Sequence, residues 1–241
     1  AYFLTVSIVM FAGIVASFGL RQTVVRLVAE SIAQGLPGRA RQALATVFFI
    51  AFLGSAVVAG AYYRFVGEWL ADSVFTMPVL TGAIGLTALW VVVLAFQAPV
   101  AEIFRGLHDI RLAVFLDGIL ASALLALFII VLHFQGITLD YWSALLASML
   151  AAATSLSFGA LQFWRRRTVF RGDGSIQPRE VVSISAPLFV TNVANYAISQ
   201  FSLWIVAANL PADEVALFGA AWRLVNLIAL PIILMNMTAN P

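Results

Sequence analysis

An arginine stands inside the last apolar segment of the chain. Arg223 follows the acidic pair Asp213-Glu214 by about 14 Å of helix at 1.5 Å per residue. A guanidinium at such a depth has to face a water-filled cavity, pair with an anion or extend to an interface. Of these three, we expect a cavity.

Carboxamide side chains accompany this arginine. Asn192, Asn195 and Gln200 fall on one face of the preceding apolar segment, and Asn226 lies three residues after Arg223. Buried amides either hydrogen-bond between helices or line a solvated path. The pattern leaves both readings open for Asn192, Asn195, Gln200 and Asn226.

Two further arginines follow the first apolar segment. Arg21 ends that segment, and Arg26 lies four residues before Glu30 in an amphipathic continuation. Such an i,i+4 pair is typical of a solvated helix face. The alternative is anion recognition, because a planar guanidinium binds phosphate through two parallel hydrogen bonds.

Enzyme and metal signatures are weak. Glu102, His108 and Asp109 lie at helical spacing, but Arg105 stands among them and would repel a cation, so we interpret this stretch as an interfacial elbow. Asp117 begins a helix near the same interface. The chain has no cysteine, which excludes thiolate chemistry, and no glycine-rich phosphate loop or nucleophile elbow occurs. We therefore expect no catalytic residue, no metal and no cofactor.

The elements that must position these residues are membrane-spanning helices. The composition is 63% hydrophobic and 10% charged, and about 20 apolar residues in a helix cross the hydrocarbon core. Runs such as 124–131 do not alternate, which excludes a β-barrel. The sequence predicts an all-α, polytopic transmembrane helix bundle with seven spans, over the charge-free stretches 1–20, 44–63, 79–101, 118–139, 141–164, 181–212 and 224–241.

Arginine placement predicts the orientation of these spans. Connections 21–43, 102–117 and 165–180 together hold eleven arginines, whereas the other three connections hold only Arg64. Cytoplasmic loops are enriched in basic residues, so the first group is expected to be cytoplasmic. The chain then starts on the outer side, and we expect at least one helix upstream. The arginine excess lies in loops rather than on one face, so we expect no nucleic-acid partner.

Two blocks of sequence carry a resemblance to a known family. The stretch from Ala16 to Glu30 (ASFGLRQTVVRLVAE) resembles the second helix and following loop of bacterial polysaccharide and O-antigen flippases, which belong to the multidrug/oligosaccharidyl-lipid/polysaccharide exporter superfamily. The stretch 184–190 with 204–224 resembles their seventh and eighth helices. The resemblance implies a transporter of two lobes, each of six or more helices. It divides the chain into an N-terminal lobe of five helices (1–164, with its first helix absent), a flexible cytoplasmic linker (165–184) and the start of a C-terminal lobe (185–241).

The resemblance also implies a function. Such flippases move an undecaprenyl-pyrophosphate-linked oligosaccharide across the bacterial inner membrane by alternating access, for polysaccharide or O-antigen export. It implies that Arg21 and Arg223 hold the pyrophosphate, and it makes Arg26, Asn192, Asn195 and Asn226 lesser candidates for binding the substrate. Implied partners are the bilayer, the lipid-linked oligosaccharide, a polysaccharide polymerase and glycosyltransferases.

Two alternatives stay open. A drug or cation antiporter of the same superfamily would need an intramembrane carboxylate, for which Asp117 is the candidate. A polyprenyl-phosphate glycosyltransferase would need catalytic carboxylates in a substantial outer loop, and the candidates Glu68 and Asp72 stand in a short one.

Overall fold

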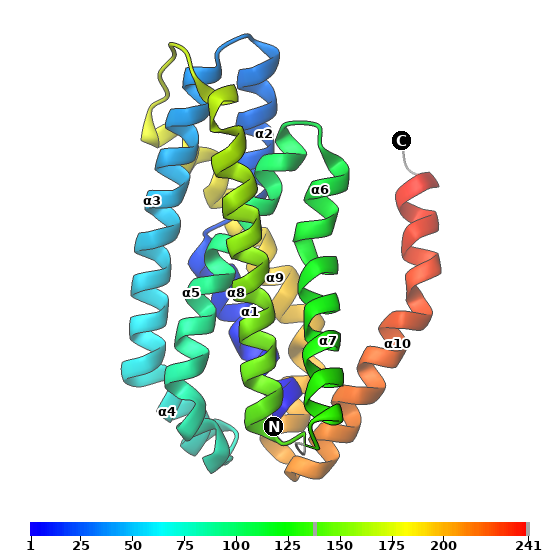
Figure 1. The fold of residues 1–241 in the computed structure, drawn as a ribbon. Helices are drawn as coiled ribbons and strands as arrows, with labels where there is room; N and C mark the ends of the chain where they lie inside the picture. Colours follow the sequence, from blue (N-terminus) through cyan, green and yellow to red (C-terminus); the bar gives the residue numbers. More distant parts are fainter. Residues whose placement is uncertain (137–138, 240–241) are drawn as a thin grey trace.

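The computed structural model describes the backbone of residues 1–136 and 139–239, and side chains up to residue 225 except 137–138. All regular elements in these ranges are helical, which confirms the predicted all-α bundle (Figure 1). The elements are α1 (Tyr2–Ser17), α2 (Leu20–Ala33), α3 (Pro37–Ala61), η1 (Tyr62–Val66), α4 (Gly67–Trp69), η2 (Leu70–Val74), α5 (Pro78–Gly106), α6 (Ile110–Val114), η3 (Phe115–Ile119), α7 (Leu120–Phe134), α8 (Tyr141–Arg166), η4 (Arg167–Phe170), α9 (Pro178–Asn209) and α10 (Ala212–Ala239).

Within the described ranges, five continuous helical stretches are long and apolar enough to cross a membrane, and the bent pair α1–α2 makes a sixth. The predicted count of seven is therefore approximate. Six of the predicted segments correspond to these spans. The seventh, 224–241, lies in α10, almost wholly outside the residues whose side chains are described. The chain is a polytopic helical membrane protein.

Residues Phe18 and Gly19 separate α1 from α2. Both have left-handed backbone angles, with φ of 46° and 70°, and the two helices meet at 44°. Glycine adopts this conformation without the steric cost that a Cβ imposes. A Cβ at Gly19 would also lie 2.4 Å from the carbonyl oxygen of Ser185, so glycine here permits both the bend and the close approach of α9.

The connections with many arginines all lie at one end of the bundle, at the top in Figure 1. Only a few residues of each connection are non-helical, because helices continue past the apolar runs. Residues 21–33 are helical, only 34–36 form the turn before α3, and only 107–109 separate α5 from α6. Charged residues limit how much of a helix lipid can surround, but the hydrogen bonds of the helix itself continue into water.

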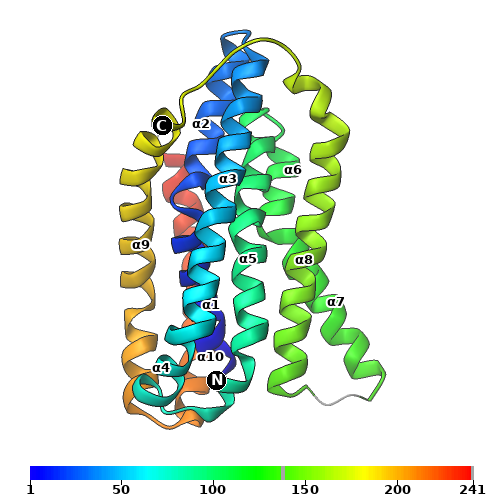
Figure 2. The ribbon, with the colours of Figure 1, turned by 90° about the vertical axis from the view of Figure 1, so that its left-hand side faces the viewer.

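The connection between α8 and α9 runs over the ends of α2 and α3 (Figure 2). It was predicted to be a flexible linker over 165–184, but α8 continues to Arg166 and α9 already begins at Pro178. Phe170 and Ile176 are buried in a core with α2 and α3. The guanidinium of Arg39 pairs with Glu180. These contacts anchor the segment to the N-terminal helices.

Helix α5 lies at the centre of the bundle and packs against α1, α2, α3 and α8. Ile103 and Phe104 are fully buried near its end, and Glu102 beside them is 1% exposed. A charged side chain is almost never buried to this degree without a partner, so Glu102 requires a cationic partner at this end of α5.

Gly54 lies at a close contact between α1 and α3. A Cβ at this position would lie 2.3 Å from the carbonyl oxygen of Ala16, a backbone atom that can move only with its helix. We expect Gly54→Ala to lower the free energy of unfolding by about 1–3 kcal/mol, the usual cost of overpacking. The matched control is Gly60→Ala in the same helix, because a Cβ there meets no atom within 4 Å. Thermal unfolding in detergent measures both, and equal melting temperatures would contradict the prediction.

Candidate functional site: a polar cavity beside α1

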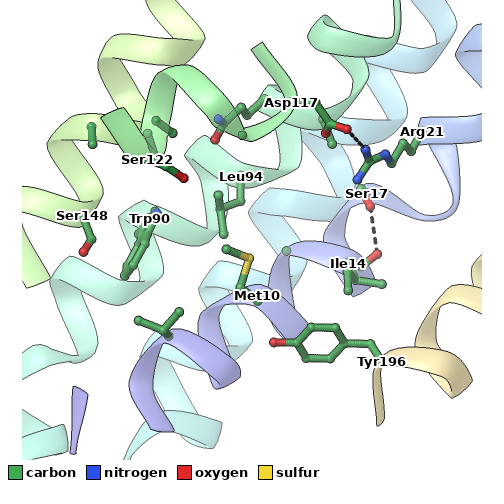
Figure 3. A pocket seen from close by; sticks show the side chains of 18 of the residues that line it. Met10, Ile14, Ser17, Arg21, Trp90, Leu94, Asp117, Ser122, Ser148 and Tyr196 are labelled. Carbon is green, nitrogen blue, oxygen red and sulfur yellow. Dashed lines mark hydrogen bonds and ion pairs between the residues drawn. The ribbon is translucent and has the colours of Figure 1, made fainter. Parts of the chain in front are cut away.

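A cavity of about 760 Å³ lies between α1, α5, α7, α8, α9 and α10. Its wall is largely apolar, with Met10 and Leu94 facing it, while polar groups enter from several helices (Figure 3). Its polar lining consists of Tyr2, Ser17, Arg21, Gln22, Gln97, Asp117, Ser122, Ser148, Asn192, Asn195, Tyr196, Ser199 and Arg223. Among the candidates from the sequence, four lie on this wall: Arg21, Arg223, Asn192 and Asn195.

Arg21 stands at the start of α2, just after the bend, and pairs with carboxylates of two other elements. Its Nε donates to Glu102 Oε1 at 2.8 Å. Its Nη2 donates to Asp117 Oδ2, a pair that Figure 3 shows at the cavity wall. The sequence singled out Arg21 as a candidate for the site but did not predict these two carboxylate partners. In this structure the guanidinium is already neutralised, and its side chain is 40% exposed.

Glu102 is the buried member of this cluster. Arg105 Nη1 lies 2.8 Å from its Oε1 and 2.7 Å from its Oε2. Only the first contact has hydrogen-bond geometry, so Oε2 is held by charge rather than by a directed bond. Arg105 also reaches Asp117 Oδ2, at 3.5 Å. Two arginines and two carboxylates thus form a cluster with no net charge, contributed by α2, α5 and η3.

The chain turns at residues 107–109, after α5, and the charged residues of the stretch interpreted as an elbow have separate roles. Glu102 faces Arg21 in the bundle, whereas Asp109 accepts a hydrogen bond from the backbone N–H of Leu112 and begins α6. Asp109 also pairs with Arg166 at 2.7 Å. The hydrogen bond from Arg166 is the main cause that lowers the pKa of Asp109, with the N–H of Leu112 next. No group of three metal-ligating side chains occurs in the described residues.

Arg223 enters the cavity from α10. Its guanidinium carbon lies 4.8 Å from the ring centroid of Phe3, a distance at which the ring face attracts a cation. No carboxylate of the described part of the chain lies within ion-pair distance of it. Arg223 therefore differs from Arg21, because its charge is available to an anion in the cavity.

The sequence left open whether the amides of α9 hydrogen-bond between helices or line a solvated path, and the structure shows both. Gln200 accepts a hydrogen bond from Ser7 Oγ at 3.1 Å, which joins α9 to α1. Asn192 exchanges two hydrogen bonds with Gln22, at 3.0 and 3.1 Å, and both residues line the cavity. Asn195 lines the cavity too. The sequence missed Gln22 because nothing near it in the chain indicates a partner 170 residues away.

Two candidates are not placed in the cavity. Arg26 is exposed on α2 and does not line it, because a five-residue step from Arg21 turns the side chain to another face of the helix. Asn226 lies outside the residues whose side chains are described.

The arrangement combines a fixed positive charge, amides and hydroxyls within an apolar helical bundle. Guanidinium groups bind phosphate oxygens, and amide and hydroxyl groups exchange hydrogen bonds with other polar groups such as hydroxyls. Such a cavity can hold a group that carries both negative charge and hydroxyls, which bare lipid would exclude.

Comparison with known proteins identifies the family of the chain. Neither a curated protein nor a solved structure matches the chain. A family model described as polysaccharide biosynthesis protein matches residues 1–241. The match covers the whole of the printed sequence, including every helix that forms the cavity, and the chain therefore belongs to the polysaccharide biosynthesis protein family.

Proposed function

We propose that this protein translocates a lipid-linked oligosaccharide, with an undecaprenyl-pyrophosphate head group, across the bacterial inner membrane. The head group and sugars occupy the cavity while the polyprenyl chain stays in the lipid. Alternating exposure of the cavity to the two sides gives the movement its direction. In this proposal the protein is a transporter and not an enzyme, and it acts with a polysaccharide polymerase and glycosyltransferases.

One observation carries the proposal: Arg223 stands on the wall of a polar cavity with no carboxylate among the described residues at ion-pair distance. A free guanidinium inside a membrane bundle is costly, and a diphosphate would satisfy it with charge-assisted hydrogen bonds. Asn192, Asn195 and Ser148 on the same wall are suited to sugar hydroxyls.

The same contacts weigh against the two alternatives. A cation antiporter needs a carboxylate that is free to bind a cation, and both Glu102 and Asp117 are paired with arginines. A glycosyltransferase would use Glu68 and Asp72, which are exposed in α4 and η2 and do not line the cavity.

Complementation of a glycan-export defect tests the function. The protein should restore surface polysaccharide in a bacterial strain that lacks its own lipid-linked oligosaccharide flippase but still makes the substrate. The readout is surface glycan measured by gel and by lectin binding, together with the amount of lipid-linked precursor on the inner leaflet. A strain that lacks the polymerase instead is the control, and it should not be restored. Normal membrane insertion without any restored surface glycan would contradict the proposal.

A further inference from the structure

Asp117 combines two properties that no other carboxylate of the described chain shares: it holds Arg21, and it lines the cavity. We propose that Asp117 is a displaceable placeholder for the substrate's diphosphate. Before the lipid carrier binds, its carboxylate occupies the place at Arg21 that a phosphate group then takes. This inference rests on the proposed function and assigns a residue that positions the anion site.

The two carboxylates at Arg21 differ in how firmly they are held. Glu102 is 1% exposed and contacts two arginines, so it cannot leave without uncovering a buried charge. Asp117 is 23% exposed, and Oδ2 makes all of its ion-pair contacts. Its other oxygen, Oδ1, has no hydrogen-bond partner among the described side chains. Water can therefore replace Arg21 around Asp117 at a small cost, which is not the case for Glu102.

The element that carries Asp117 is also suited to move. Asp117 lies in η3, a single π-helical stretch between the short helix α6 and the longer α7. Isolated π-helical turns inside helices occur frequently at functional sites. Gly118, which follows Asp117 in the cavity wall, breaks the helical backbone angles there. A local change at η3 could turn the carboxylate away without shifting α5.

The exchange keeps Arg21 neutralised at every stage. Its Nε keeps its hydrogen bond to Glu102, while Nη2 exchanges the carboxylate of Asp117 for a phosphate group. A diphosphate has more charge and more acceptor oxygens than a carboxylate, so it competes for a planar guanidinium, whereas a neutral sugar does not. The placeholder therefore selects for the diphosphate end of the carrier, and its release couples binding to a movement of η3 relative to α2.

Binding of farnesyl diphosphate to the purified protein in detergent tests the placeholder. Asp117→Asn keeps the shape of the side chain but removes the competing charge, so we expect farnesyl diphosphate to bind about tenfold more tightly than to the wild type. The matched control is Asp109→Asn, which also removes a carboxylate paired with an arginine but lies outside the cavity lining. We expect its affinity to equal that of the wild type. If the wild type binds the diphosphate and Asp117→Asn binds it equally well or more weakly, the placeholder inference is overturned, but the proposed function is not.

A second measurement uses the wild-type protein and so does not depend on the folding of a variant. Hydrogen–deuterium exchange with and without farnesyl diphosphate should show faster exchange in residues 115–119 when the diphosphate is bound, and unchanged exchange in residues 141–166. Slower or unchanged exchange in 115–119 with bound diphosphate would overturn the placeholder. If neither the wild type nor Asp117→Asn binds the diphosphate, the anion site of the proposed function is wrong and this inference falls with it.

Discussion

Replacing Arg223 by alanine is expected to weaken the binding of farnesyl diphosphate by roughly ten- to hundredfold. Hydrogen bonds to charged groups contribute about 1.5–3 kcal/mol each, and each 1.4 kcal/mol changes affinity about tenfold. In the described part of the chain Arg223 has no ion-pair partner, and its guanidinium lies over the ring of Phe3. The variant should therefore remain folded, and it should fail to restore glycan export.

Two further variants make this result specific. Arg223→Lys keeps the charge but loses the planar pair of donors, so we expect partial binding and partial export. Arg64→Ala removes an arginine that lies outside the cavity lining, beside Phe65, and should leave both unchanged. Isothermal titration calorimetry measures the binding of farnesyl diphosphate by all three variants, and the complementation assay measures their glycan export. If Arg223→Ala binds as tightly as the wild type, the cavity does not recognise its anion through this guanidinium.

Replacing Glu102 by glutamine is expected to have the largest effect on stability. The change leaves Arg21 and Arg105 with only Asp117 between them, and it places an unpaired positive charge beside the buried end of α5. Breaking a buried ion pair by removing one partner costs about 3–5 kcal/mol. Because the side chains of Arg21 and Arg105 are 40% and 36% exposed, water screens part of this charge, and we expect a loss near the lower limit, about 3 kcal/mol.

The control for this variant is Glu30→Gln. Glu30 lies 3.5 Å from Arg39 with its side chain 38% exposed, and exposed ion pairs contribute about 0–1 kcal/mol. Unfolding of purified protein, followed by loss of helical circular dichroism on titration with a denaturing detergent, compares the two. A midpoint for Glu102→Gln close to that of Glu30→Gln would show that the four-residue cluster does not stabilise the bundle.

Local chemistry in the sequence was sufficient for the membrane architecture. Apolar runs of about 20 residues have one solution in lipid, a helix that satisfies its own backbone, and the arginine-bearing connections do lie together at one end of the structure. The limits of the helices were less predictable. The connections 21–43 and 102–117, which lie between the charge-free stretches, are mainly helical, because charge restricts contact with lipid and does not terminate a helix.

The composition of the cavity was only partly predictable. An arginine or asparagine in an apolar run is costly in any helix bundle, so Arg223, Asn192 and Asn195 could be singled out by residue type. The partners of Arg21 could not. Glu102 and Asp117 are 81 and 96 residues away from it, and Asp117 looked like an interfacial residue at a helix start. Whether two such groups meet depends on how α2, α5 and η3 are rotated and packed against one another, and no spacing within a single segment encodes that rotation.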